Sequence, residues 1–144
     1  MLFRSIVRFQ AAFPSLKASG GSIVNLLDIH ADRPLAQHSV YCISKAGLLM
    51  CTMALAKEFA PFVRVNGVSP GAILWPEQAI NNYISTEGVT LEIKKAEILE
   101  KVPMSRRGEP NDVVQAVEFL ACTCSAGYVT GQVIRVDGGR SLNQ

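Results

Sequence analysis

Residues 40–60 are apolar or small on nearly every side of a helix drawn through them, and this feature most constrains the fold. A helix without a polar face has to be covered on several sides. Two short runs flank it: residues 22–27 lie between a glycine pair and an aspartate, and residues 63–68 end at Ser-Pro-Gly. Both runs are largely apolar with β-branched residues, which predicts buried parallel strands of an α/β fold.

The first residues of the chain allow two interpretations. Residues 1–27 contain Arg4, Arg8 and Lys17 and no acid, which is typical of a mitochondrial presequence. Apolar residues also recur there at intervals of four, three and four, which predicts an amphipathic core helix over residues 2–16. We favour the helix.

The remaining elements are predicted from composition and from the positions of proline and glycine. A solvated helix is expected over residues 91–101, where Glu and Lys are frequent. A second helix is expected to begin at the proline at position 110 and to run to about residue 124, and glycines bracket a final strand over residues 132–136. Residues 72–90 are expected to form a long loop.

Composition limits the class of protein. The 144 residues, 49% of them hydrophobic, amount to one domain over residues 1–144, and a net charge of +2 gives no basic field for nucleic acid. No apolar run reaches the roughly 20 residues that span a bilayer. Four cysteines lack zinc-type spacing, so we expect buried reduced thiols in a soluble, cytoplasmic protein. His30 and His38 have no third ligand nearby, so no metal site is expected.

Tyr41 and Lys45 stand four residues apart in YCISK, and Asp28 precedes Tyr41 by thirteen residues. Helical spacing stacks the phenol and the ammonium on one face. Bringing the pKa of a tyrosine from about 10 to about 7 takes roughly 4 kcal/mol. One ammonium at about 4 Å supplies roughly that much at an effective dielectric near 20, so Lys45 alone is expected to suffice. A nearby carboxylate opposes this and favours a protonated Tyr41.

The pair resembles the Y-x-x-x-K pair of the short-chain dehydrogenase/reductase family, which follows a strand ending in an active-site polar residue. Three more segments resemble the family in order: VRVNGVSPGAI, VPMSRRGEPNDVV and YVTGQVIRVDGG. The resemblance implies the C-terminal half of a doubly wound Rossmann-type parallel sheet. Asp28 then lies at the carboxyl edge of the sheet, where ligands bind in open α/β folds.

The resemblance also implies roles for individual residues. Tyr41 and Lys45 would be catalytic and would contact the nicotinamide cofactor, with Pro70, Gly71 and Ile73 beside it. Asn66 would line the cofactor side, or its amide would only satisfy local backbone. Helices near residues 2–16 and 40–60 would pair with a second subunit in a homo-oligomer, unless other parts of the fold cover them.

Asp28 departs from the serine that most members of the family carry. An aspartate there, with DIHADRPL and PGAILWPE, resembles the bacterial pteridine reductase-like branch. This resemblance implies an NADPH-dependent reductase of pterin or dihydropterin substrates, with Asp28 and Tyr41 as catalytic and substrate-binding residues. Trp75 would pack on the pterin or only cover the core. Arg33 would steer an acidic substrate tail or be a solvated surface residue.

Two alternatives to pterin reduction remain open. One is another short-chain reductase, for 3-oxoacyl thioesters or other carbonyl substrates. The other is a non-catalytic fragment that only associates with other subunits, because no glycine-rich turn follows a strand to hold a pyrophosphate. The chain therefore reads as N-terminally truncated, and we expect it to be inactive and not to bind NADPH alone. The residues that separate NADP from NAD belong to the family's early strands, so NAD also fits.

Overall fold

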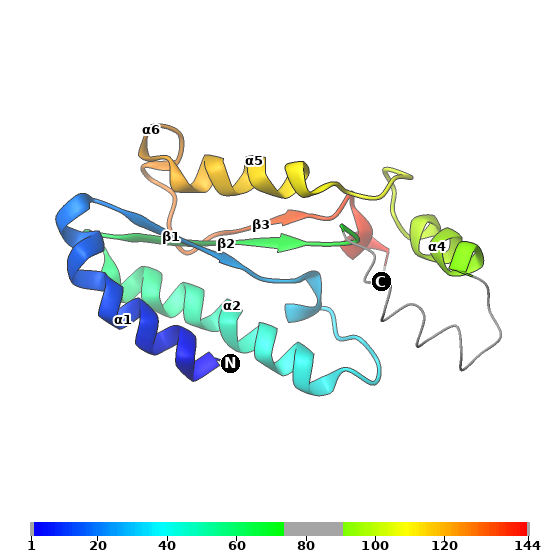
Figure 1. Cartoon of the computed structure of the whole chain (residues 1–144), viewed down its shortest axis with the longest axis horizontal. Coiled ribbons are helices and arrows are strands. Elements are labelled where there is room, and N and C mark those ends of the chain that lie inside the picture. Colours follow the sequence, from blue (N-terminus) through cyan, green and yellow to red (C-terminus); the bar gives the residue numbers. More distant parts are fainter. Residues whose placement is uncertain (1, 74–90, 144) are drawn as a thin grey trace.

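A parallel sheet in the order β1-β2-β3 forms the middle layer of the protein (Figure 1). The structure is a computed structural model and describes residues 2–73 and 91–143. In register, Val24 of β1 pairs with Asn66 of β2, and Gly67 of β2 pairs with Val133 of β3. The predicted α/β class with a parallel sheet is confirmed. The strands are β1 (Ser22–Leu26), β2 (Arg64–Pro70) and β3 (Val133–Val136).

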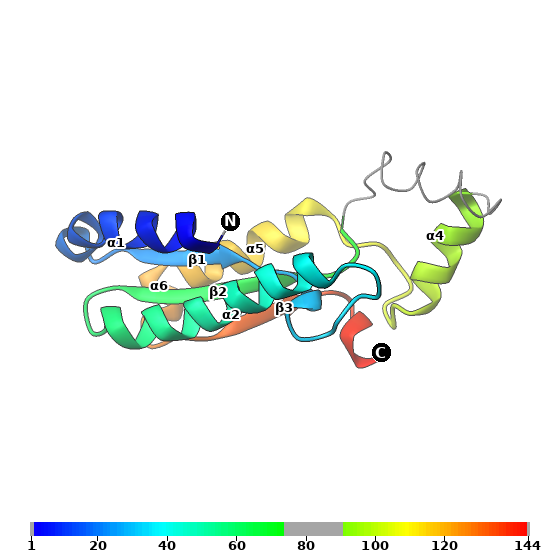
Figure 2. The same cartoon turned by 90° about the horizontal axis from the view of Figure 1, so that it is seen from below.

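Helices cover both faces of the sheet. α1 (Leu2–Ser19) and α2 (Ser39–Phe59) lie on one face, and α5 (Pro110–Ala121) lies on the other (Figure 2). α4 (Leu91–Glu100) stands beyond the end of the sheet, near the carboxyl ends of the strands. Because α2 connects β1 to β2, the two strands can run parallel with a helix packed against them.

The second predicted helix ends earlier than expected. It was expected to run from residue 110 to about residue 124, but α5 stops at Ala121 and a separate turn, α6 (Thr123–Ala126), follows. The backbone at Cys122 is extended, with φ −75° and ψ 125°. The Ser125 hydroxyl donates to the carbonyl of Phe119 at 2.8 Å, so it satisfies a carbonyl that a continuing helix would have bonded.

The core between α1, α2 and the sheet is apolar. Phe59 and Val63 are buried at its centre, and Phe13 of α1 lies with its ring 4.3 Å from that of Phe59. Ile6 and Phe9 pack against the same cluster, which confirms the core-facing side predicted for the first helix.

The outer side of α2 remains uncovered in the described part of the chain. Val40 and Ile43 are 81% and 70% exposed, whereas Leu55 and Phe59 on the inner side are buried. By length and composition alone α2 could cross a membrane, which corrects the expectation that no apolar stretch is long enough. Core helices of soluble proteins pass the same test. One side of α2 therefore packs against the sheet, and the opposite side exposes apolar residues.

Candidate active site

Asp28 lies just past the carboxyl end of β1, as the sequence predicts. It is the N-cap of a short 3-10 helix, η1 (Ile29–Ala31), and its Oδ1 accepts the backbone N–H of His30 at 2.9 Å. A short polar side chain at an N-cap satisfies an otherwise unpaired backbone donor. This bond fixes the carboxylate at the edge of the sheet and leaves Oδ2 for another partner.

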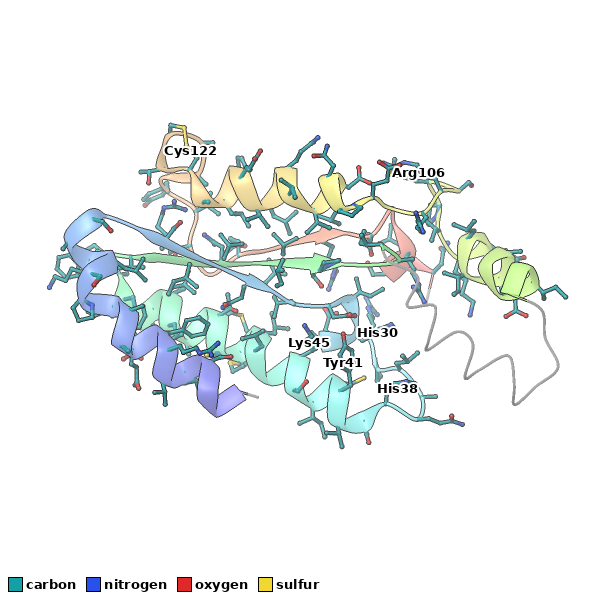
Figure 3. The ribbon with its side chains drawn as sticks, in the orientation of Figure 1. His30, His38, Tyr41, Lys45, Arg106 and Cys122 are labelled. Atoms are coloured by element: carbon teal, nitrogen blue, oxygen red, sulfur yellow. A yellow bond between two sulfur atoms is a disulfide. The ribbon has the colours of Figure 1, made fainter. Side chains whose placement is uncertain are left out.

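That partner is Tyr41, in the first turn of α2. Its Oη donates to Oδ2 of Asp28 at 2.6 Å, a short bond of the kind expected between a hydroxyl and a carboxylate. Figure 3 shows Tyr41 and Lys45 on neighbouring turns of α2, beside the turn that carries His30. The thirteen-residue separation thus becomes a direct contact between two of the predicted catalytic residues.

Lys45 lies on the same helix face but does not hold the phenol. Its Nζ donates to the carbonyls of Leu26 at 3.1 Å and Leu27 at 3.3 Å, and lies 5.9 Å from the centre of the Tyr41 ring. The ammonium therefore joins α2 to the end of β1. An ammonium has three N–H donors, so these two bonds leave one for a ligand.

The electrostatics of Tyr41 favour its protonated form. Burial, and then the hydrogen bond and the charge of Asp28, raise the pKa of Tyr41 well above its ordinary value of 10.0. Both causes penalise the phenolate, since burial removes water and a carboxylate repels a second negative charge. The expectation that Lys45 alone would lower this pKa toward 7 is wrong. The expectation that a carboxylate keeps the proton on Tyr41 is confirmed.

The predicted cofactor-side residues lie at the end of β2. The N–H of Gly71 donates to the carbonyl of Val136 at 3.0 Å, and a Cβ built on Gly71 would lie 2.6 Å from the Cβ of Asp137. Gly71 is therefore required for close packing between the ends of β2 and β3. Pro70 closes β2, and Ile73 lines a hollow of about 410 Å³ beside Gly138. Their cofactor contacts stay predictions, and Trp75 lies outside the described residues.

Asn66 is a buried residue of β2 whose amide nitrogen and oxygen both bond to backbone. Its Nδ2 donates to the carbonyl of Val129 at 2.8 Å, and its Oδ1 accepts the N–H of Gln132 at 3.0 Å. Of the two interpretations drawn from the sequence, the structure favours satisfaction of local backbone. The amide holds the loop that enters β3.

The remaining polar candidates lie in the connection from η1 to α2. Nδ1 of His30 lies 2.8 Å from the carbonyl of Arg33, and Nδ1 of His38 lies 2.9 Å from the carbonyl of Ala36. Arg33 is exposed, so its proposed steering role stays a prediction. Within residues 2–73 and 91–143, no group of His, Cys, Asp and Glu could hold a metal ion.

An ion pair next to Asp28 was not predicted from the sequence. Arg135 of β3 pairs with Asp32, the C-cap of η1, across 103 positions of sequence. Arg135 also borders the 410 Å³ hollow and a second hollow of about 320 Å³ near Leu27. No spacing rule links two residues so far apart, so only the folded chain shows that β3 contacts the Asp28 turn.

The fold is a Rossmann-type parallel sheet, with Tyr41 and Lys45 on the helix that follows β1 and Asp28 just past the end of that strand. The family profile described as "Enoyl-(Acyl carrier protein) reductase" matches residues 3–141. The chain belongs to the short-chain dehydrogenase/reductase family.

Individual relatives agree with this assignment. The chain is 40% identical over 124 residues to an L-xylulose reductase of Caenorhabditis elegans, covering 85% of this chain and 46% of that protein. A short-chain dehydrogenase/reductase of unknown function from the same organism, solved with cofactor, superposes with a TM-score of 0.79 at 31% identity. That match covers 100% of this chain and 54% of the solved one.

A third comparison concerns a complex with ligands. A 7α-hydroxysteroid dehydrogenase solved with NADH and 7-oxo glycochenodeoxycholic acid gives a TM-score of 0.75 at 29% identity, covering 91% of this chain and 49% of that one. The chain thus spans about half the length of the proteins it matches.

Proposed function

We propose that this chain carries the catalytic residues of an NADPH-dependent reductase of pterin-like substrates, with Tyr41 as proton donor. The observation that carries the proposal is the 2.6 Å hydrogen bond from Tyr41 to Asp28. A reduction consumes a proton as well as a hydride, so the site needs a group that holds its proton at neutral pH. The pKa of Tyr41, raised from an ordinary value that already lies above neutral pH, keeps the phenol protonated there.

Asp28 supports a nitrogen-rich substrate over a simple carbonyl compound. A serine hydroxyl at this position could donate a hydrogen bond to a carbonyl oxygen, whereas a carboxylate only accepts. A pterin presents ring and exocyclic N–H groups, which suit such an acceptor. In this scheme Asp28 orients the pterin and Tyr41 protonates a ring nitrogen. The tyrosinate left behind is reprotonated by a solvent proton that Asp28 takes up and passes on.

The residues present fit the ribose side of a nicotinamide cofactor. Lys45 keeps one N–H donor beyond its two backbone bonds, and the Tyr41 oxygen can accept a hydrogen bond from a ribose hydroxyl. When bound, the reduced nicotinamide supplies the hydride. Lys45 would then hold the ribose while it fixes α2 against the end of β1.

A second candidate function is the reduction of an ordinary carbonyl substrate. It is favoured by the relatives, since an L-xylulose reductase is among the proteins most similar to this chain. In that case Asp28 would stand where most members of the family carry serine, but it would not select the substrate.

The two candidates differ in what they reduce and in the effect of one substitution. The longest in-frame gene product that contains these residues is assayed with dihydrobiopterin and with an acetoacetyl thioester, following NADPH absorbance. We expect activity on the pterin, and Asp28→Ser to reduce it strongly. Asp32→Ser removes the same charge one turn away and is the matched control. Activity on the thioester alone would defeat pterin reduction.

The role of Tyr41 is tested separately. Tyr41→Phe removes the proton donor and keeps the ring, so kcat should fall on the order of 10²- to 10⁴-fold. Tyr128→Phe is the matched control, because Tyr128 is fully exposed and belongs to a loop away from the site. Equal kcat values for Tyr41→Phe and the unchanged protein would remove Tyr41 from the mechanism on either substrate.

We also propose that α1 and α2 associate with a second copy of this chain. Val40, Ile43 and Met50 of α2 expose large apolar side chains, and Val7 of α1 is 63% exposed. Contiguous apolar surface of this kind marks association sites. Ile43→Glu should shift the protein toward monomer in sedimentation, whereas Ile93→Glu, on α4, should not.

NADPH titration of the 144-residue chain tests the non-catalytic alternative, which fails if binding is in the micromolar range.

A further inference from the structure

Cys122 and Cys124 form a disulfide at the end of α5, with their Cα atoms 5.4 Å apart. Both residues are exposed, whereas Cys51 is buried and Cys42 is half-buried. This corrects the expectation of four buried reduced thiols. The apolar run around the pair reads as helix interior, but the helix ends at Ala121, so both cysteines lie at the surface.

The disulfide lies where α5 is tied to two strands. The Arg64 guanidinium, at the start of β2, donates to the carbonyls of Leu120 at 2.8 Å and Ala121 at 3.1 Å. The Ser22 hydroxyl, at the start of β1, donates to the same Ala121 carbonyl at 3.1 Å. The carbonyl of Ala121 accepts two of these three bonds between α5 and the sheet, and Cys122 is the next residue.

We propose that Cys122 and Cys124 are a reversible thiol–disulfide site that reacts with small disulfides such as glutathione disulfide, and that its closure fixes the end of α5 on β1 and β2. The thiolate of one cysteine attacks glutathione disulfide, forming a mixed disulfide and releasing one glutathione. The second thiolate attacks the protein sulfur of that mixed disulfide, which forms the Cys122–Cys124 bond and releases the second glutathione. The protein thiols are oxidised and lose two protons, and glutathione disulfide is reduced.

Two features favour reversibility. A disulfide gains stability from the length of the loop it closes, and here the cysteines are only two residues apart. Exposed disulfides are also the ones open to attack by external thiols. Cys51 is a poor competitor because burial raises the pKa of its thiol.

The cysteine pair is remote from the proposed chemistry. Cys122 adjoins the amino ends of β1 and β2, while Tyr41 and Lys45 lie at the carboxyl end of the sheet (Figure 3). The site therefore acts on the packing of α5 and does not depend on the function proposed above. Its readouts need no enzyme activity.

The first test measures the oxidation state of each cysteine. The chain is equilibrated in buffers of varying ratio of glutathione disulfide to glutathione, quenched with acid and iodoacetamide, and digested for mass spectrometry. As the proportion of glutathione disulfide rises, we expect Cys122 and Cys124 to become resistant to alkylation together. Their peptide should then be two hydrogens lighter than the unalkylated peptide with two free thiols. In excess glutathione both cysteines should again be alkylated. Alkylation of both in every buffer, or closure that excess glutathione cannot reverse, would overturn the proposal.

Variants and hydrogen exchange complete the design. Cys122→Ser should leave Cys124 as a mixed disulfide with glutathione, whereas Cys42→Ser should leave closure unchanged. Amide hydrogen exchange over residues 119–126 should be slower in the oxidised chain than in the reduced one, because the end of α5 is held. Equal exchange rates in the two forms, or loss of closure in Cys42→Ser, would contradict the proposal.

Discussion

Tyr41 donates its phenolic hydrogen to Oδ2 of Asp28 over 2.6 Å, and this bond joins the start of α2 to the turn after β1. Oδ1 of Asp28 is held by the N–H of His30, so the carboxylate cannot turn away freely. The bond keeps the proton on the phenol and keeps the phenol next to the sheet edge. A substrate that accepts the Tyr41 proton has to replace Asp28 as the acceptor. Asp28 then lies next to the tyrosinate, to which it can pass a proton taken up from solvent.

Replacing Asp28 should lower the pKa of Tyr41. Asp28→Ser removes a hydrogen bond and a charge that both disfavour the phenolate, but burial, the largest cause, remains. We therefore expect the pKa of Tyr41 to fall and still to exceed its ordinary value of 10.0. The measurement is an ultraviolet titration of tyrosinate in a Tyr83→Phe, Tyr128→Phe background.

Asp32→Ser serves as the control for that titration, because Asp32 lies at the other end of η1 and is paired with Arg135. It should leave the Tyr41 titration nearly unchanged. An unaltered curve in Asp28→Ser would mean that burial alone sets the pKa of Tyr41, and the acceptor role of Asp28 would be lost.

The parts of this site that follow from local rules were predictable from sequence. Helical spacing places Tyr41 and Lys45 on one face, and the end of a buried strand places Asp28 at the sheet edge. These are backbone statements, and each depends only on neighbours within about one element. The three strands were predictable for the same reason, but β2 continues to Pro70, two residues past its expected end at residue 68.

Side-chain partners could not be predicted in this way. Lys45 bonds to the carbonyls of Leu26 and Leu27 because β1 ends beside α2, which only the packed sheet determines. The pair of Asp32 and Arg135 spans 103 positions of sequence. The helix end at Ala121 was missed because the run is apolar on both sides of it, so periodicity gives no stop signal there.

The Arg106–Asp112 pair should make the fold sensitive to acid. Arg106 donates to both carboxylate oxygens, at 2.8 Å and 3.0 Å, and this bond, with that of the Glu109 N–H, lowers the pKa of Asp112 to about 2. A carboxylate with a lowered folded-state pKa contributes stability above its unfolded value of 3.8. That contribution should be lost as the pH falls from about 4 toward 2.

The carboxyl carbon resonance of Asp112, followed by NMR, measures this pKa directly. Arg106→Gln should raise it toward 3.8 and weaken the fall in the free energy of unfolding at acid pH. Arg107→Gln removes the same charge one residue away and should leave the Asp112 titration unchanged. A shift of equal size in both variants would indicate a general charge effect.

Asn66 should be a stabilising residue. Its amide makes two half-buried bonds, to Val129 and Gln132, so Asn66→Ala leaves the carbonyl of Val129 and the N–H of Gln132 without these partners. The expected loss in the free energy of unfolding is about 1–3 kcal/mol, measured by urea denaturation. Asn143→Ala, at an exposed position, is the control and should cost little. Similar losses for both variants would contradict the structural role of the Asn66 amide.

Gly71 and Gly108 test whether the packing at the site edge is rigid. A Cβ on Gly71 would lie 2.6 Å and 2.8 Å from the Cβ and Cα of Asp137, so backbone would have to move. A Cβ on Gly108 would clash with the Cδ1 end of the Ile73 side chain, which can rotate, and would lie at an ordinary 3.7 Å from the Ala72 carbonyl oxygen. Gly71→Ala should therefore lower the free energy of unfolding by about 1–3 kcal/mol, and Gly108→Ala by less. If thermal unfolding ranks Gly108→Ala as the more damaging change, the close contact of Gly71 with Asp137 does not limit the fold, and the glycine would have to be explained by a ligand.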